Sequence, residues 1–278
     1  MTIQEYNAHP GISASAIKAG RASMMQMRYA MVTPRDSTPS TPAMRWGTLA
    51  HLAMLQPAEF AAAVAVWDGG RKAGKEWAAF ASEADGRHIV TPDELERLGA
   101  MQAAARANAD ARFFVSKVEA VEATMTWTRP DIGACKGRPD CIGGGFLGDY
   151  KTARDIDPRA LFGQFHRLGY LHQMAWYMDG FGAMSGRQVH SCLILAQQSI
   201  PPYECGVIEI PVKLLISTLG ASGDVGGEDT CLAIARHYRA CEALGSYPGR
   251  YVGVTEYLPP AYALGGENAE VDMEGIEA

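Results

Sequence analysis

Hydrophobic and polar residues alternate along several short segments of the chain, and this period of two predicts β-strands. Residues 118–129 have Val121, Ala123, Met125 and Trp127 on one side, and Glu122, Thr124, Thr126 and Thr128 on the other. Residues 135–151 predict two further strands joined by a tight antiparallel turn at Gly143-Gly144-Gly145. Apolar segments at 190–197 and 203–212 complete a mixed sheet.

A helical period, with apolar residues three and four positions apart, recurs between these strands. It predicts helices over residues 13–31, 44–55, 91–111, 157–180 and 229–244, and a loop over 33–42. Ser13 or Ser15 can cap the first helix, and Thr91-Pro92-Asp93-Glu94 is a strong start for the third. The order of elements predicts the α/β (α+β) fold class, with a mixed sheet flanked by helices.

The composition indicates one large folded domain, over residues 1–264. Of the 278 residues, 47% are hydrophobic and 20% are charged, which is sufficient for a sizeable core. No apolar run is long enough to span a bilayer, and Met1-Thr2-Ile3-Gln4-Glu5 does not begin a signal peptide. The six cysteines form no CxxC pair, so we expect reduced thiols in a cytoplasmic protein, without a zinc site or disulfides.

The net charge of −6 is concentrated at the C-terminus. Residues 265–278 contain five acids and no base, and we expect this tail to be disordered. These five acids account for all but one of the net negative charges. The total charge argues against a nucleic-acid partner, but a near-neutral body with clustered carboxylates remains compatible with one.

The candidate chemistry lies on the two strands beside the glycine turn. Asp149 and Lys151 are two positions apart in a strand, so both side chains point to one face and Tyr150 to the other. The turn can bring Asp140, on the neighbouring strand, opposite them. Two carboxylates and an ammonium in one small space suit a hard divalent cation and an oriented or deprotonated water. From the spacing alone, a solvated surface ion pair is the commoner case.

Two predicted helices carry polar residues whose role the pattern leaves open. His51 is the only titratable residue inside the apolar helix 44–55, where a histidine is most often a hydrogen-bonded core residue. Gln173 and Tyr177, four residues apart, share a stripe of the helix 157–180 with Tyr170 and His166. An ordinary, partly exposed helix face is the simplest interpretation of that stripe.

Several other charged residues are candidates for contacts near the site. Arg71, Lys72 and Lys75 lie beside Trp77 in a predicted loop, which is either solvated or faces DNA. Glu122 can approach the carboxylates, and we expect it to support the site rather than to bind a metal. Closer to the acids, the candidates for phosphate contacts are Lys136, Arg138 and Arg154, with ordinary surface charges as the alternative.

These residues resemble the PD-(D/E)xK nuclease pattern, which Pro139-Asp140 and Asp149-Tyr150-Lys151 match in two halves. His51, the two acids with Lys151, and Gln173-xxx-Tyr177 occur in the order used by RecB-type nucleases. Over roughly residues 8–260 the chain is more specifically similar to the RecE family, the exonuclease VIII type of phage and prophage recombination nuclease. The similar blocks are Ile12-Ser13-Ala14-Ser15, Trp46-Gly47-Thr48-Leu49-Ala50-His51, Leu55-Gln56-Pro57, Thr126-Trp127-Thr128-Arg129-Pro130-Asp131 and Cys135-Lys136-Gly137-Arg138-Pro139-Asp140.

The resemblance implies a restriction-endonuclease-like core and a role for each site residue. The implied ligands of Mg²⁺, for which Mn²⁺ can substitute, are His51, Asp140, Asp149 and the backbone carbonyl of Tyr150. Lys151 is expected to position or deprotonate the attacking water. Gln173 and Tyr177 are expected to hold DNA or metal-bound water.

The resemblance further implies a 5′-to-3′ exonuclease that degrades linear double-stranded DNA and leaves 3′ single-stranded overhangs for recombination by strand annealing. It implies a ring-shaped homo-oligomer, such as a tetramer, and a partner protein that anneals the exposed strand. The alternatives are another RecB-like nuclease, acting as an endonuclease or on single strands, and a non-catalytic DNA-binding relative. An iron–sulfur type is disfavoured, because no three closely spaced cysteines follow the Gln173-xxx-Tyr177 element. A non-catalytic relative would most simply lack Lys151 or one of the acids, and all are present.

Overall fold

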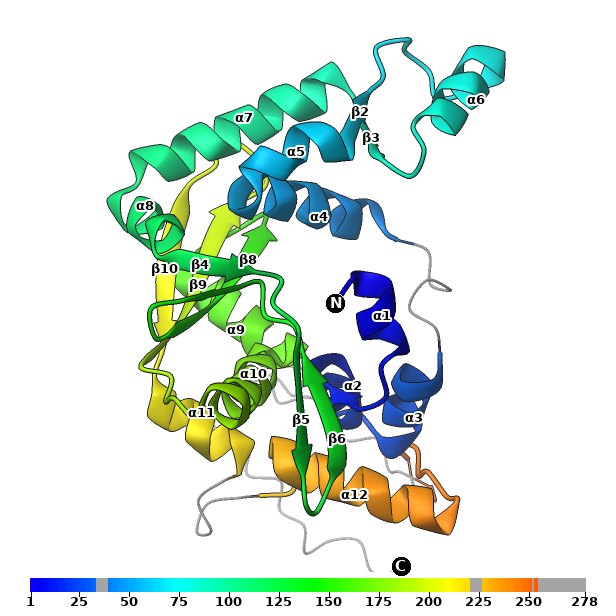
Figure 1. Cartoon of the computed structure of the whole chain (residues 1–278), viewed down its shortest axis with the longest axis vertical. Coiled ribbons are helices and arrows are strands. Elements are labelled where there is room, and N and C mark those ends of the chain that lie inside the picture. Colours follow the sequence, from blue (N-terminus) through cyan, green and yellow to red (C-terminus); the bar gives the residue numbers. More distant parts are fainter. Residues whose placement is uncertain (34–39, 221–226, 252, 255–278) are drawn as a thin grey trace, which may run out of the picture.

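The computed structural model describes residues 1–33, 40–220, 227–251 and 253–254. The acidic tail at 265–278, its boundary at residue 264 and most of the predicted loop 33–42 lie outside the described residues. A mixed five-stranded sheet stands at the centre of the molecule, with helices on both of its faces (Figure 1). The predicted fold class is therefore confirmed.

The central sheet has the strand order β10-β9-β8-β7-β4. Its only parallel pair within the described residues is β8 with β9, and the other neighbours are antiparallel. The strands are β4 Val118–Val121, β7 Cys141–Gly143, β8 Phe146–Ala153, β9 Ser191–Gln198 and β10 Cys205–Ile210. The two smaller sheets contain β1 Ile12–Ser13, β6 Gly133–Gly137 and β5 Met125–Arg129, and β2 Val64–Val66 with β3 His88–Val90.

The helices divide into an N-terminal set and a C-terminal set. The first set is α1 Ile3–Ala8, α2 Ala14–Gly20, α3 Met24–Val32, α4 Pro42–Leu55, α5 Pro57–Ala63, α6 Gly74–Glu83, α7 Pro92–Ala107 and α8 Ala109–Ser116. The second is α9 Pro158–Leu168, α10 Tyr170–Ser185, α11 Val212–Leu219 and α12 Cys231–Leu244. None of the described helices is both long and apolar enough to cross a lipid bilayer.

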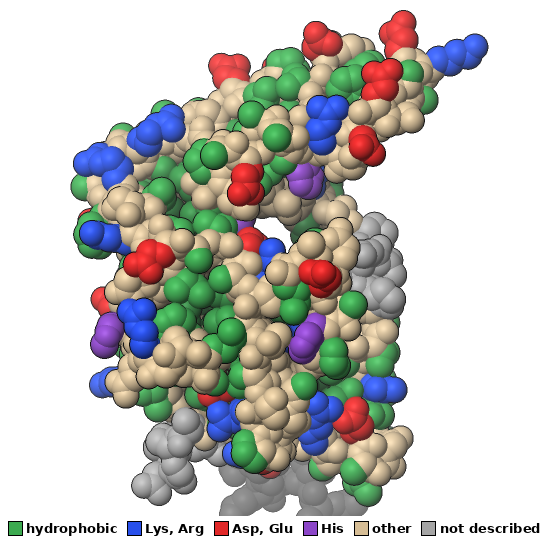
Figure 2. Space-filling model, viewed as in Figure 1, with side chains coloured by type: hydrophobic (Ala, Val, Ile, Leu, Met, Phe, Trp, Pro, Cys, Tyr) green, Lys and Arg blue, Asp and Glu red, His purple; other side chains and the backbone are tan. Residues whose placement is uncertain are grey.

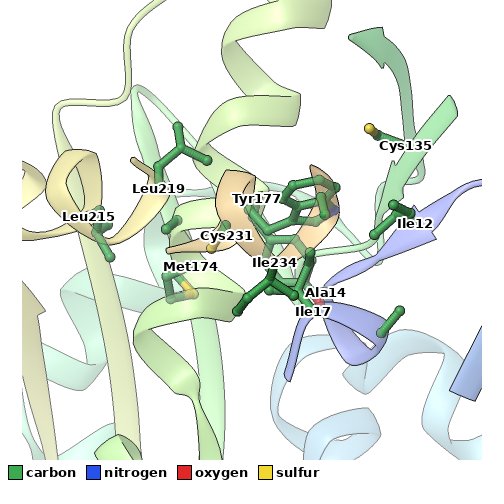
Figure 3. Close-up of a cluster of buried hydrophobic side chains, with 14 of the residues drawn as sticks. Ile12, Ala14, Ile17, Cys135, Met174, Tyr177, Leu215, Leu219, Cys231 and Ile234 are labelled. Atoms are coloured by element: carbon green, nitrogen blue, oxygen red, sulfur yellow. The ribbon is translucent and has the colours of Figure 1, made fainter. Parts of the chain in front are cut away.

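Each face of the central sheet has its own apolar core. On one face, Leu147 and Ile194 pack with helices α2, α10, α11 and α12, and Figure 3 shows part of this cluster, with Met174 and Tyr177 near its middle. On the other face, Tyr150 packs with helices α4, α7 and α8. Because side chains alternate along β8, Asp149 and Lys151 lie on the face covered by α10. All six cysteines are buried and free.

Several predicted elements are interrupted in the structure. The strand 118–129 divides at Glu122, which has a left-handed backbone (φ 52°), so that β4 and β5 belong to different sheets. The helix 13–31 divides into α2 and α3, because Ser23 caps a new helix by accepting from the N–H of Gln26. The helix 157–180 divides into α9 and α10 at Gly169, whose φ of 72° suits a glycine and ends an α-helix.

Some short elements are not predicted from the sequence. Helix α11 begins at Val212, the last residue of a predicted strand, and the helix predicted over 91–111 divides into α7 and α8 at Asn108. Helices α1, α5 and α6 and the paired strands β2 and β3 were not predicted. Helix α6 projects from the body beyond β2 and β3 (Figure 1), and none of its residues is buried.

Candidate active site

The glycine turn joins β7 to β8 and brings the two halves of the acidic pattern together. Asp140 directly precedes β7, and its Oδ2 accepts a hydrogen bond of 2.9 Å from the backbone N–H of Tyr150. Lys151 Nζ lies 2.8 Å from Asp149 Oδ2 and 3.9 Å from Asp140 Oδ2. The Tyr150 side chain points to the opposite face and donates to Gln197 over 2.6 Å. The predicted meeting of two acids and a lysine is therefore present.

Asp149 is the most deeply buried carboxylate of the site. Its side chain is 2% exposed, compared with 17% for Asp140. Burial and the neighbouring Asp140 raise the pKa of Asp149 to about 7, although the Lys151 ammonium opposes this shift. A carboxylate that is costly to ionise in isolation is stabilised by a nearby cation, so Asp149 is suited to face a bound metal.

Lys151 carries its charge in this arrangement. Burial by itself lowers the pKa of the ammonium. The negative charges of Asp149 and Asp140 raise it by more than this, so the pKa lies above its ordinary value. The Tyr170 ring stands beside it, with its centroid 5.2 Å from Nζ. A lysine ammonium has three donors and no acceptor, so Lys151 can orient a water or a phosphate oxygen and offset negative charge.

Helix α10 contributes Gln173 to the same face of the sheet. Gln173 Nε2 donates to Asp149 Oδ1 over 2.8 Å, and its Oε1 accepts from Lys18 Nζ over 2.6 Å. Tyr177, one turn further along α10, is buried in the core against Gly137, where an added Cβ would lie 3.0 Å from the Tyr177 ring. Of the predicted Gln173-xxx-Tyr177 pair, Gln173 thus contacts a site carboxylate directly.

Helix α4 and the kink after β4 place a second group of ligand atoms beside Asp140. His51 Nε2 lies 3.6 Å from Glu122 Oε1 and 3.7 Å from Asp140 Oδ2. One ligand atom from each of these three residues lies within 4.8 Å of the other two. The left-handed backbone at Glu122 and its N–H bond to the Asp140 carbonyl, 2.9 Å long, set this arrangement.

His51 Nε2 is buried and has no hydrogen-bond partner among the described residues. A buried polar atom of a core histidine normally has such a partner. An imidazole nitrogen without a hydrogen-bond partner, beside two carboxylates, is instead typical of a metal site. These groups can ligate a divalent cation that accepts oxygen and nitrogen ligands, such as Mg²⁺ or Mn²⁺. The residues present therefore fit a metal at this position.

A cavity of about 280 Å³ gives access to these groups. It is lined by Gly47, Thr48, His51, Glu122, Asp140, Tyr150, Lys151 and Thr152. Figure 2 shows an opening at the middle of this face of the molecule, with acidic and basic side chains at its edge. Helix α4 thus forms one wall of the cavity, and strand β8 forms the other.

The basic residues near the acids have three different environments. Lys136 is buried, and its ammonium donates to the carbonyls of Tyr6, Asn7 and His9. Its ammonium is thus turned into the protein, and the prediction that it contacts a phosphate is wrong. Arg138 forms an ion pair with Glu122 through its Nε and donates to Thr124 Oγ1 over 3.0 Å, which ties it to the candidate metal ligand. Arg154 is exposed just after β8, and its predicted phosphate contact stays a prediction.

The basic loop lies around the beginning of α6, distant in the fold from the central sheet (Figure 1). Arg71, Lys72 and Lys75 are exposed. Lys72 Nζ lies 5.8 Å from the ring centroid of Trp77, and Trp77 packs edge-on against Trp67 at 5.4 Å. The loop is thus held by aromatic contacts, and its proposed role in facing DNA stays a prediction.

Three contributions to the site are not evident from the sequence alone. Glu122 was expected only to support it, but the structure places its carboxylate among the candidate metal ligands. Lys18 and Tyr170 were assigned no role, and both lie against the acid–lysine pair or its glutamine. Lys18 lies close to the Ile12-Ser13-Ala14-Ser15 block, which is the signal that could have drawn attention to it.

Comparison with solved structures supports the fold. No protein with curated annotation matches the chain in sequence. A crystal structure from Eubacterium rectale, described as "Putative exonuclease", aligns over 94% of this chain and 96% of that one, with 11% identity and a TM-score of 0.56. A second solved structure, SSO0001, aligns over 77% of this chain and 82% of that one, with 12% identity and a TM-score of 0.26. The first similarity shows a shared fold, whereas the TM-score of the second is too low to indicate one.

The family model described as "PDDEXK-like domain of unknown function (DUF3799)" matches residues 13–220, which is most of the chain. The matched range includes the candidate ligands, Lys151 and Gln173. The acids and lysine at the glycine turn agree with that description. The chain therefore belongs to this PDDEXK-like family.

Proposed function

We propose that this chain is a Mg²⁺-dependent deoxyribonuclease that digests linear double-stranded DNA from its 5′ ends and leaves 3′ single-stranded overhangs. The observation that supports the chemistry most strongly is the meeting of Asp140, Asp149 and Lys151 beside the unpartnered nitrogen of His51. The polarity and the preference for ends are supported by the resemblance to the RecE family, and exonuclease action also by the fold shared with the Eubacterium rectale protein.

The proposed metal would be held by His51, Asp140 and Glu122, with Asp149 as a further ligand on the Lys151 side. A divalent cation bound there supplies Lewis-acid chemistry, because it lowers the pKa of a water and offsets charge on a phosphoryl oxygen. We add Glu122 to the ligand set proposed from the sequence, which also included the Tyr150 carbonyl, because its carboxylate lies beside His51 and Asp140. Glu122 is kept in place by Arg138, so the two form one unit at the edge of the cavity.

The protein's own residues perform the remaining tasks of hydrolysis. The Lys151 ammonium can hold the attacking water or a non-bridging phosphate oxygen, and it offsets the charge that develops on the phosphate. Asp149 and Asp140 keep that ammonium in place through their ion pairs. Gln173 fixes one oxygen of Asp149, which leaves the other oxygen directed at Lys151.

The wider setting is also part of the proposal. DNA ends are the proposed substrate, which implies action in the cytoplasm of a bacterial or phage-infected cell. The RecE resemblance supports a ring-shaped homo-oligomer and a single-strand annealing protein as a partner. Arg154 and the loop with Arg71, Lys72 and Lys75 are the exposed basic groups that we propose as contacts to DNA phosphates.

The proposal is tested by incubating the purified chain with linear duplex DNA and with covalently closed circular DNA, with Mg²⁺ or with a chelator. We expect acid-soluble nucleotide from the linear duplex only, in the presence of Mg²⁺ only, and none from Asp149→Asn. Nicking of the closed circle would favour an endonuclease, and digestion of single strands alone would favour a single-strand exonuclease. DNA binding without hydrolysis would indicate a non-catalytic relative.

A further inference from the structure

We infer that Lys18 is a positioning residue of this site: by donating to Gln173 it fixes the orientation of the Gln173 amide, which in turn holds the Asp149 carboxylate. The inference rests on the proposed function for its catalytic effect. The contacts themselves belong to the fold, and their effect on metal binding can be measured without DNA.

A glutamine amide has two orientations that differ only by exchange of its oxygen and nitrogen, and its neighbours decide between them. Lys18 Nζ can only donate, so it requires the Gln173 oxygen, which it meets at 2.6 Å. An ionised Asp149 can only accept, so it requires the Gln173 NH₂, which it meets at 2.8 Å. The reversed amide would bring donor against donor and acceptor against acceptor, so Lys18 and Asp149 select the same orientation.

Burial makes this selection effective. As whole residues, Gln173 is 7% exposed and Asp149 is 1% exposed, so little solvent is available to replace a lost hydrogen-bond partner. Without the Lys18 donor, the buried Gln173 oxygen loses its hydrogen bond, and the amide is free to turn away from Asp149. In such a buried network the loss of one donor affects the groups beyond its direct neighbour.

The fold holds Lys18 in place from two sides. Lys18 lies in the last turn of α2, whose N-terminus is capped by Ser13, with the Ala16 N–H donating to Ser13 Oγ over 3.3 Å. Gly169, between α9 and α10, leaves room for the lysine stem, because a Cβ there would lie 3.0 Å from Lys18 Cγ.

The Tyr170 ring lies close to both ammonium groups of the site. Its ring centroid lies 5.5 Å from Lys18 Nζ and 5.2 Å from Lys151 Nζ. An aromatic face attracts a cation, so this ring helps to hold both lysines close to Asp149. Lys151 then takes Asp149 Oδ2, while Lys18 acts on Asp149 Oδ1 through Gln173.

The test is a double-mutant cycle with Lys18→Met and Gln173→Met, singly and combined. Methionine keeps an unbranched apolar stem and removes the donor. Lys18→Arg retains a charged donor, and Lys213→Met, on the exposed side of α11, is the matched control. Each protein is titrated with Mn²⁺ by calorimetry without DNA, and kcat and KM are then measured on linear duplex with Mg²⁺. Thermal melting confirms that each variant is folded.

We expect Lys18→Met and Gln173→Met each to weaken Mn²⁺ binding and to lower kcat by about 10- to 100-fold, which is typical of residues that orient metal ligands. The double variant should be no worse than Gln173→Met alone, and Lys18→Arg should recover most of the loss. Additive losses, or equal losses in Lys18→Met and Lys18→Arg, would show that Lys18 does not act through Gln173 and would overturn the inference. A wild-type protein that binds Mn²⁺ but digests no DNA would defeat the proposed function, whereas the Mn²⁺ cycle would still decide the role of Lys18.

Discussion

The Oδ2 atom of Asp140 accepts a hydrogen bond from the backbone N–H of Tyr150, 2.9 Å away. The same oxygen lies 3.7 Å from His51 Nε2 and 3.9 Å from Lys151 Nζ, so three nitrogen atoms surround it. Through this oxygen the residue before β7 is fixed to the strand that carries the second acid and the lysine. Asp140 is thus the residue at which the candidate metal ligands and the acid–lysine pair meet.

His51 is the residue for which the catalytic and core interpretations differ most. His51→Gln should fold normally but lose most activity with Mg²⁺, because an amide replaces a nitrogen ligand poorly. Raised Mn²⁺, which accepts nitrogen ligands more readily, should restore part of it. A metal titration read by nucleotide release tests this, with His237→Gln on the exposed side of α12 as the control. The same Mg²⁺ dependence in both variants would show that His51 is a core residue and not a metal ligand.

Lys151→Met should separate catalysis from binding. Because the ammonium is proposed to orient the water and to offset charge on the phosphate, its removal should lower kcat more than about 100-fold. The ammonium is not a metal ligand, so Mn²⁺ should bind at least as tightly as in the wild type, and DNA binding should stay intact. Calorimetry and a mobility-shift assay measure the two kinds of binding, and Lys213→Met serves as the control. A loss of Mn²⁺ binding would instead assign Lys151 a structural role in holding Asp149.

Glu122→Gln tests whether the Glu122 carboxylate is a metal ligand. The amide is similar in shape but uncharged, so we expect Mn²⁺ affinity to fall by about 10-fold or more. Glu119→Gln is the matched control, because Glu119 is exposed on β4. Equal Mn²⁺ affinity in the two variants would limit Glu122 to its ion pair with Arg138.

The contribution of Asp149 to the stability of the metal-free protein should fall as the pH rises from about 4 to 7. The pKa of this carboxyl is raised to about 7 in the fold from an ordinary value of 3.8. Over that range the folded state therefore binds more protons than the unfolded state, and unfolding becomes easier as the pH increases. Above about pH 7 this contribution levels off.

His172 acts in the opposite direction in an overlapping range, because burial lowers its pKa. The effect of Asp149 is therefore measured as the melting temperature of the wild type minus that of Asp149→Asn. We expect this difference to fall by a few degrees between pH 5 and pH 7 in the presence of a chelator. A difference that stays constant or rises with pH would contradict the assignment of Asp149 as a carboxyl that burial makes costly to ionise.

The sequence predicts the acid–lysine pair well, because the strand period alone places Asp149 and Lys151 on one face and Tyr150 on the other. The glycine turn is sufficient to bring Asp140 opposite them. The placement of His51 depended on the family resemblance, since nothing in its apolar helix distinguishes a ligand from a core histidine. Lys18 could not be paired with Gln173, because the crossing of α2 and α10 is a property of tertiary packing.

The errors in the predicted fold have local causes. Glu122 adopts a left-handed backbone without being glycine, so the alternation of residues 118–129 gave no sign of a break. The apolar period continues across Gly169, and therefore α9 and α10 look like one helix in the sequence. Strands β2 and β3 have three residues each, which is too short for a period to be seen.

The central claim is tested most directly by strand-specific digestion of one linear duplex with Mg²⁺. Two preparations are used, one labelled at the 5′ ends and one at the 3′ ends, and the products are sampled over time and separated under denaturing conditions. The proposal predicts early release of the 5′ label as mononucleotide or short fragments, while the 3′-labelled strand stays full length and becomes accessible to a single-strand-specific probe. Early release of the 3′ label, or internal cuts in both strands from the first time point, would contradict it.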